Sequence, residues 1–342
     1  MTSLSGDTAK RRVKRQQVGE LALVRYIRDE FSKGSLRNDL AIGIGDDAAV
    51  VRVGGGNMLI SADTMCEGVH FDMAFATAYQ VGFKLVSVNV SDIYAMGGTP
   101  DWFLLTTSFP PGTSDDFARK FLSGVKDALN LYGAVLIGGD ITSCHSGIVV
   151  TGIVLGHADT PISRNGARAG DKIYVTGALG DSACGLELLK KIMAPIAIEK
   201  GQRADKPLPW EIMNPLLKRH LMPKVIRPEF GGAAVTAMMD ISDGLALDIR
   251  RLCQDSGVGA MLYESKIPMS GQMLSAAAFL GNTDPLSFSL CGGEDYECLF
   301  TSADDIDTAH YIGDVTDDRL VLISKNNKSV DLMDCGYEHF KT

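Results

Sequence analysis

Acidic residues recur at turns along nearly the whole chain, and most of these turns directly follow or end an apolar run. The turns are Gly45-Asp46-Asp47, Ser61-Ala62-Asp63-Thr64, Val90-Ser91-Asp92, Gly138-Gly139-Asp140, Asp240-Ile241-Ser242-Asp243-Gly244 and Gly292-Gly293-Glu294-Asp295. Folding would place these carboxylates at the edges of packed elements, where like charges can coexist only around bound cations. We therefore expect the acidic turns to converge on magnesium ions and a polyphosphate.

The composition is that of a globular protein with a sizeable core. The 342 residues are 45% hydrophobic and 22% charged, and this length suggests roughly two domains. A net charge of −9 disfavours nucleic acid as a partner, because phosphate backbones need clustered Lys and Arg. No stretch approaches the ~20 apolar residues of a membrane span. The sequence thus predicts a soluble cytoplasmic protein that binds neither nucleic acid nor a membrane.

The seven cysteines are scattered and odd in number, and they contain no CxxC pair. This pattern favours reduced thiols over a disulfide framework or a zinc site. Residues 1–17 form a basic polar leader that we expect to be disordered. Its basic cluster at 10–15 is either a solvated tail or an anion contact, and the leader has no apolar segment of signal-peptide type.

Periodicity and turn signals predict a mixed fold, α/β (α+β), with two domains. Residues 18–158 are expected to form the first domain and 159–342 the second, because Pro161, Gly166 and Gly170 punctuate a polar stretch between them. A segment with several prolines, 194–228, is predicted to wrap the surface. The predicted helices are 20–31, 78–95, 114–131, 186–189 and 214–221, and the predicted strands are 48–53, 58–60, 102–109, 134–137 (buried), 148–155 and 172–176.

Two acidic positions stand out within these elements. Asp92 continues the apolar stripe of Val81, Leu85 and Val88 on its predicted helix, which is costly unless the carboxylate binds a metal or is satisfied by a cap or an ion pair. The 240–244 turn precedes a helix, so its Ser and Asp side chains could either bind a ligand or act as an N-cap.

Familiar catalytic motifs are missing from the sequence. It has no GxxxxGK[ST] loop, HExxH helix or GxSxG elbow. A GxGxxA string occurs at 43–48, but Asp46 and Asp47 inside it would repel a pyrophosphate. The remaining option is that magnesium ions, held by carboxylates, bridge the protein to phosphate groups.

The ordered set of motifs resembles that of the thiamine-monophosphate kinases over about residues 19–340. These motifs are GIGDDA (43–48), DTMCEGVHF (63–71), NVSDIYAMGG (89–98), GGDIT (138–142), SRNGA (163–167), DISDGL (240–245), GGEDYE (292–297) and GYEHF (336–340). The resemblance implies ATP-dependent phosphorylation of thiamine monophosphate to thiamine pyrophosphate, with several Mg²⁺ ions. It also implies the two-domain aminoimidazole-ribonucleotide synthetase-like fold, in which the N-terminal domain binds ATP and metal, its strands pair across a homodimer, and the C-terminal domain closes the site.

The resemblance also assigns site residues. The implied metal ligands are Asp46, Asp63, Asp92, Asp140, Asp240 and Asp243, and Ser61 can replace the hydroxyl that relatives carry where this chain has Ala62. ATP would contact Gly139, Asp140, Arg164 and Ser242, and the catalytic set would be Asp46, Asp140 and Arg164. Thiamine monophosphate would contact His70, Glu294 or Asp295, and Tyr337. For His70 and Tyr337, an ordinary half-buried histidine and a core aromatic are the alternatives.

The implied chemistry needs no general base, because the attacking phosphate oxygen is largely ionised at neutral pH. We therefore expect direct in-line transfer without a phosphoenzyme. Two alternatives remain from the sequence: another ATP-dependent synthetase of the same superfamily, of selenide or purine type, or a non-catalytic protein that binds divalent cations or nucleotides.

Overall fold

The computed structural model describes residues 20–31, 38–204, 206–318, 321–325 and 328–340. The chain divides into two compact units, Leu36–Tyr337 and a small unit of Met1–Ser35 with Glu338–Thr342. In the small unit, helix α1 spans Glu20–Phe31, as predicted. The predicted leader at 1–17 lies outside the described residues.

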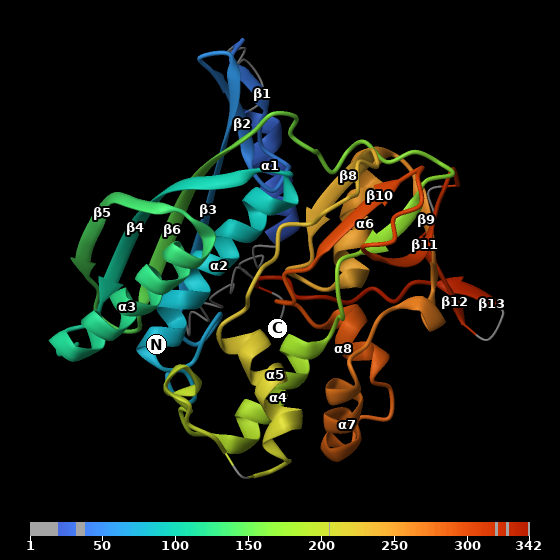
Figure 1. Ribbon diagram of the computed structural model, residues 1–342. Coiled ribbons are helices and arrows are strands. Elements are labelled where there is room, and N and C mark those ends of the chain that lie inside the picture. The colour runs from blue at the N-terminus through green and yellow to red at the C-terminus, as the bar shows by residue number, and fades with distance from the viewer. Residues whose placement is uncertain (1–19, 32–37, 205, 319–320, 326–327, 341–342) are drawn as a thin grey trace, which may run out of the picture. The chain divides into compact units, whose positions relative to one another are not determined.

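The first half of the large unit is a six-stranded sheet whose strand order is β1-β2-β3-β6-β4-β5. Helices α2 (Ala78–Ala95) and α3 (Asp115–Tyr132) cover one face of this sheet (Figure 1). Alternate residues of β6 are buried, which is the period-two pattern of a strand packed on one face. The strands are β1 Leu40–Ile42, β2 Ala49–Val53, β3 Gly56–Cys66, β4 Thr99–Phe109, β5 Val135–Ser143 and β6 Val149–Ala158.

Two glycines let α2 and α3 approach closely. A methyl group on Gly82 would lie 2.1 Å from the Phe121 carbonyl oxygen, and one on Gly124 would lie 1.9 Å from the Tyr79 carbonyl oxygen. Any side chain at these positions would therefore push the helices apart. This contact holds α2, which carries Asp92, firmly against the rest of the domain.

The second half is a seven-stranded sheet of order β13-β12-β9-β11-β7-β10-β8, with α6 (Leu245–Ser256) packed against it. The helices α4 (Asp181–Ile192), α5 (Trp210–Leu221), α7 (Gly271–Leu280) and α8 (Leu286–Cys291) lie together beside it (Figure 1). The strands are β7 Lys172–Val175, β8 Val235–Asp240, β9 Gly259–Tyr263, β10 Cys298–Ser302, β11 His310–Thr316, β12 Val321–Lys325 and β13 Lys328–Asp331. Mixed sheets with helices confirm the predicted class.

Two predictions about burial are wrong. Residues 134–137 were expected to form a buried strand, but β5 is an edge strand whose residues are all exposed, and Ile141 is 77% exposed. The 194–228 segment was expected to wrap the surface, yet its Met213, Leu216 and Leu217 lie in the core because α5 packs against α4. Apolar content alone did not distinguish an edge strand from a core strand, or a surface segment from a core helix.

The expectation of reduced thiols is wrong for one pair, because Cys291 and Cys335 form a disulfide. Five of the cysteines in the described part of the chain are free. The disulfide joins the start of the 292–297 motif to the segment that leads into Tyr337. Two predicted acceptor-side motifs are thereby held side by side.

None of the described helices is both long enough and apolar enough to cross a membrane.

Candidate active site

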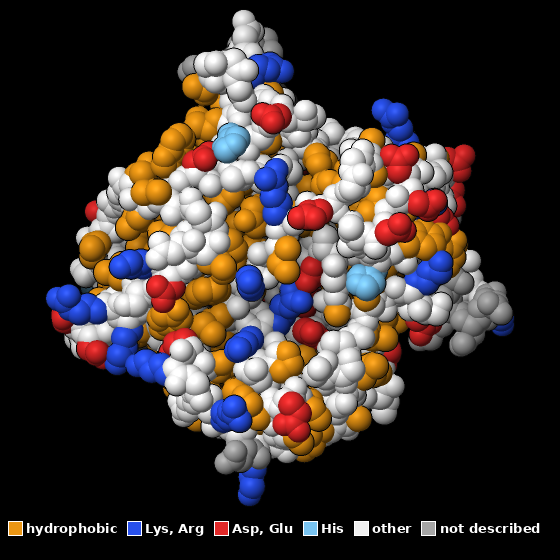
Figure 2. Space-filling view, in the orientation of Figure 1, with side chains coloured by type: hydrophobic (Ala, Val, Ile, Leu, Met, Phe, Trp, Pro, Cys, Tyr) orange, Lys and Arg blue, Asp and Glu red, His pale blue; other side chains and the backbone are white. Residues whose placement is uncertain are grey.

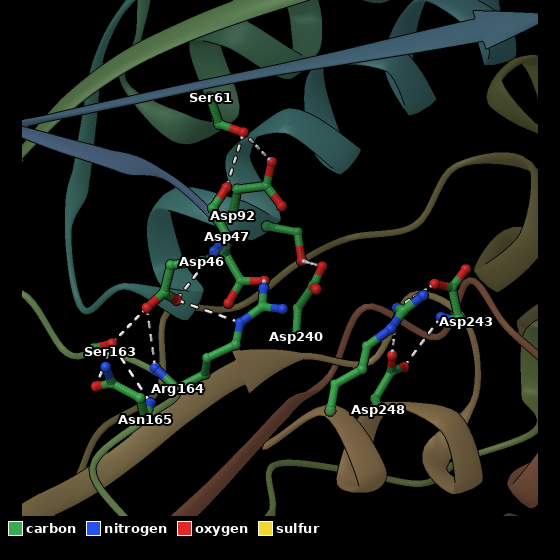
Figure 3. A network of polar contacts seen from close by, with 12 residues as sticks. Asp46, Asp47, Ser61, Asp92, Ser163, Arg164, Asn165, Asp240, Asp243 and Asp248 are labelled. Atoms are coloured by element: carbon green, nitrogen blue, oxygen red, sulfur yellow. Dashed lines mark hydrogen bonds and ion pairs between the residues drawn. The ribbon is translucent and has the colours of Figure 1, made fainter. Parts of the chain in front are cut away.

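Three acidic side chains from separate parts of the chain meet in the large unit. Asp47 lies just before β2, Asp92 on α2, and Asp240 at the end of β8. One carboxylate oxygen from each lies within 4.8 Å of the other two (Figure 3). We call these three residues the acidic triad. Its hard oxygen donors are those that Mg²⁺ prefers.

Electrostatics in the acidic triad favour a bound cation. Burial and, after it, the other carboxylates raise the pKa of Asp92 well above its ordinary value. Burial also raises the pKa of Asp47 and of Asp240, although Arg164 opposes this at both residues. Asp63 lies close by, and burial followed by repulsion from Asp240 and Asp243 raises its pKa to about 6.

One polar atom of the acidic triad lacks a partner. Asp47 Oδ2 is buried and makes no hydrogen bond to any described residue. An orphaned carboxylate oxygen of this kind is costly, and a divalent cation would satisfy it. This atom and the donor chemistry show that the residues fit a magnesium site.

Hydroxyl groups orient two of the three carboxylates. Ser61 Oγ donates to Asp92 Oδ2 at 2.5 Å, and Ser91 Oγ donates to Asp240 Oδ2 at 2.6 Å. Ser61 thus lies beside the acidic triad, where its predicted role as a metal ligand would require it. Ser91, one residue before Asp92, had no role assigned from the sequence.

Arg164 and Asp46 border the acidic triad on one side (Figure 3). The Arg164 guanidinium forms an ion pair with Asp47, and its Nε lies 3.5 Å from Asp46 Oδ1. Asp46 accepts hydrogen bonds from Ser163 Oγ at 2.5 Å and from the Arg164 backbone N–H at 3.2 Å. The structure therefore directs Asp46 towards the 163–165 loop and places Asp47 in the acidic triad.

The sequence contained the Asp46-Asp47 doublet but did not indicate which of the two faces the other carboxylates. The doublet lies in a turn before β2, so no strand alternation fixes which of its side chains faces the other carboxylates. The distinction depends on where the 163–165 loop lies, and that loop is more than a hundred positions away in the sequence.

The 240–244 turn carries a second network that the sequence did not reveal. Asp243 forms an ion pair with Arg251, which also contacts Asp248 Oδ1 at 3.1 Å. Asp248 is fully buried and accepts hydrogen bonds from the N–H groups of Asp243 and Gly244. Neither Ser242 nor Asp243 caps α6, because the N-cap residue is Gly244 and makes no side-chain bond. The N-cap alternative is therefore wrong.

The predicted acceptor residues occupy different environments. His70 Nδ1 accepts the Cys66 backbone N–H at 3.0 Å. Glu294 is ion-paired and partly open, whereas Asp295 is 0% exposed and accepts the N–H groups of Gly180 and Ser182 at the start of α4.

Tyr337 is the fourth predicted acceptor residue. Its side chain is exposed, and its backbone N–H donates to the Asp243 carbonyl at 2.9 Å. This bond places the segment of Tyr337 directly beside the 240–244 turn.

Gly139 and Asp140 do not join the acidic triad within one chain. Gly139 on β5 pairs with Leu105, Leu105 with Gly152, and Gly152 with Asp63. Three strand spacings of about 4.8 Å therefore lie between Gly139 and Asp63, which puts the two residues roughly 14 Å apart. Among the described residues, Asp140 is not one of the carboxylates that meet in the acidic triad.

Comparison with known proteins identifies the family. Residues 45–158 match the AIR synthase related protein, N-terminal domain, and residues 168–325 match the C-terminal domain of the same family. A thiamine-monophosphate kinase of Aquifex aeolicus (strain VF5) is 35% identical over 288 residues, which cover 84% of this chain and 86% of the relative. The chain belongs to the thiamine-monophosphate kinase family.

Other members agree over nearly the full length. The thiamine-monophosphate kinase of Escherichia coli (strain K12) is 32% identical over 95% of this chain and 99% of its own. The solved structure of AaThiL complexed with AMPPCP and TMP aligns with a TM-score of 0.79 and 32% identity, and the alignment covers 94% of this chain and 97% of that one. The aminoimidazole-ribonucleotide synthetase-like fold expected from the motifs is therefore confirmed.

The raised pKa values predict how pH and magnesium act on this kinase-family protein. A carboxyl group with a raised pKa holds its proton more tightly in the folded state, so folding stability falls as pH rises through the interval between its unfolded and folded values. For Asp63 this interval runs from 3.8 to about 6. Without metal, the melting temperature should fall from pH 5 to pH 8. Added Mg²⁺ should raise it more at pH 8 than at pH 5, as thermal melts in EDTA and in Mg²⁺ would show. If Mg²⁺ raised the melting temperature equally at both pH values, these carboxylates would not be the magnesium site.

Proposed function

We infer that this protein is an ATP-dependent kinase that phosphorylates thiamine monophosphate to thiamine pyrophosphate. The observation that carries this inference is the acidic triad beside Arg164 in a family member whose relative AaThiL was solved with AMPPCP and TMP. A site of buried carboxylates with one fixed cation suits chemistry between two polyanions, because such chemistry depends on positioning and charge neutralisation.

The acidic triad would hold the magnesium ions together with neighbouring groups. Besides burial, Asp63 raises the pKa of Asp92 and Asp243 raises that of Asp240, while Asp46 accepts the Asp47 backbone N–H and Ser61 donates to Asp92. We propose Asp46, Ser61, Asp63 and Asp243 as further magnesium ligands. When bound, magnesium would supply positive charge to the donor and acceptor phosphates.

The remaining residues would bind and orient the substrates. Arg164 forms ion pairs with Asp46 and Asp47, and its buried Nε makes no hydrogen bond to any described residue, so a phosphate could accept one from it. On the acceptor side we propose His70, Glu294 and Tyr337. Asp295 is a less suitable contact, because its carboxylate is buried against the N-terminus of α4.

We also propose a homodimer that forms along β5. This strand pairs with β4 on one side only among the described strands, and its exposed residues include Ile137 and Ile141. Apolar side chains gather over this sheet on the left of Figure 2. A long apolar edge strand is normally covered. In a dimer, Gly139 and Asp140 of one subunit could complete the acidic site of the other.

A cytoplasmic location is part of the proposal, because ATP is the phosphoryl donor.

The function is tested by mixing the protein with MgATP and thiamine monophosphate and measuring ADP and thiamine pyrophosphate. We expect equal amounts of the two products, and no ADP when the acceptor is omitted. ADP formation that does not depend on thiamine monophosphate would contradict the proposed acceptor.

The direct in-line mechanism predicts inversion of configuration at phosphorus. The measurement uses ATP made chiral at the γ-phosphoryl group and determines the configuration of the product. Net retention would indicate two successive transfers, and hence a phosphoenzyme that this mechanism excludes.

A further inference from the structure

Glu294 is held by a buried pair of side chains from two different helices. Lys84 on α2 places Nζ 2.7 Å from Glu294 Oε1, and His220 on α5 places Nδ1 3.1 Å from Oε2. Lys84 is 2% exposed and His220 is 4% exposed. Each carboxylate oxygen of Glu294 therefore has one partner supplied by the protein.

Lys84 also touches the second acceptor motif. Its Nζ donates to the His70 carbonyl oxygen at 3.1 Å. One buried ammonium group thus joins the 63–71 motif to the 292–297 motif, which lie more than two hundred positions apart. Both contacts satisfy donors of the buried ammonium, and both partners belong to motifs predicted to bind the acceptor.

Glu294 itself is in an unusual conformation. Its φ angle is +66°, a region that residues other than glycine rarely adopt, and its backbone N–H donates to the Ser242 carbonyl at 2.8 Å. Strained backbone of this kind clusters at ligand sites. The side chain keeps 24% exposure, so the carboxylate is fixed by the protein and still reachable.

The charges indicate what this carboxylate could recognise. Burial opposes ionisation of Glu294, but Lys84 and His220 outweigh it and lower its pKa to about 2. The group is therefore ionised and can only accept hydrogen bonds. Because Lys84 offsets its charge, Glu294 is better suited to accept a hydrogen bond than to attract a cation. The N–H donor that thiamine monophosphate offers is the amino group of its pyrimidine ring.

We propose that Lys84 and His220 are positioning residues that fix the Glu294 carboxylate so that it accepts a hydrogen bond from the amino group of the acceptor's pyrimidine. This inference rests on the proposed function. The pair would act on recognition of the acceptor, while the acidic triad and Arg164 act on the phosphates.

The test compares KM for thiamine monophosphate with KM for ATP in Lys84→Met. We expect KM for the acceptor to rise about 10- to 100-fold, which is the range for losing a charged hydrogen bond, while KM for ATP stays within about 2-fold. Gln80→Met is the matched control. Gln80 is buried on the same helix, but its side chain bonds Ile196 and Glu199 and not Glu294. It should leave both KM values within about 2-fold.

A double-mutant cycle separates positioning from general packing. If Lys84 acts through Glu294, Lys84→Met should change KM for the acceptor by less than about 2-fold in a Glu294→Gln background. A rise that persists there, or an equal rise in both KM values, would overturn the proposal. If Lys84→Met alone does not fold, His220→Gln must raise KM for the acceptor selectively, and failure to do so overturns it equally.

The acceptor analogue that carries an oxygen in place of the pyrimidine amino group, oxythiamine monophosphate, provides a second measurement. Wild-type protein should prefer thiamine monophosphate by at least about 100-fold in kcat/KM, since a hydrogen-bonding site rejects an analogue that leaves its polar group unpaired. Lys84→Met should reduce this preference at least about 10-fold, and an unchanged preference would overturn the proposal. Wild-type protein that phosphorylates neither compound would instead refute the proposed function, and this inference with it.

Discussion

Replacing Asp92 with Asn should lower kcat by at least about 1,000-fold, because the substitution removes a charged ligand from the centre of the acidic triad. The same variant should melt at a higher temperature than wild-type protein in EDTA. The reason is that burial and the neighbouring carboxylates make the Asp92 charge unfavourable when no cation is bound. Steady-state ADP release and thermal melts in EDTA and in Mg²⁺ would measure both effects.

Asp127→Asn is the control for that experiment. Asp127 is exposed on α3 and accepts a hydrogen bond from Tyr79, so the same isosteric change there removes a charge far from the acidic triad. It should leave kcat within about 2-fold of wild type. Wild-type turnover in Asp92→Asn would rule out the acidic triad as the metal site. A lower melting temperature in EDTA would contradict the argument from repulsion.

Asp140→Asn should also abolish turnover while the fold survives, because Asp140 is exposed on an edge strand. The informative experiment combines it with Asp92→Asn in one dimer. If Asp140 serves the partner's site, a heterodimer of the two variants has one site with both substitutions and one site with neither. Co-expression with two affinity tags and tandem purification would isolate this heterodimer, and we expect about half the wild-type kcat per dimer.

A heterodimer as inactive as both parent homodimers would show that Asp140 acts within its own chain. That result would contradict the expectation from the strand register, which puts Gly139 of β5 roughly 14 Å from Asp63 of β3. Sedimentation of wild-type protein supplies the necessary control. A monomer at assay concentrations would contradict the dimer along β5 directly.

The predicted acceptor residues show what local sequence patterns cannot predict. The sequence offered Glu294 and Asp295 equally, and the structure separates them by their partners: Lys84 and His220 for the first, the start of α4 for the second. His220 lies in the 194–228 segment, which the sequence predicted to wrap the surface. Its role depends on α5 packing into the core, and sequence spacing did not reveal that.

The sequence by itself determined the elements with clear periodicity, the acidic character of the site and the family. Helix α2 begins and ends where the spacing predicted, and the ordered motifs specified the relatives before any coordinates. Only the tertiary structure decided that Asp47 rather than Asp46 meets Asp92 and Asp240, that β5 is an exposed edge, and that Cys291 pairs with Cys335. The physical reason is that periodicity fixes which way a side chain points within its own element, whereas convergence depends on how elements distant in the sequence pack against one another.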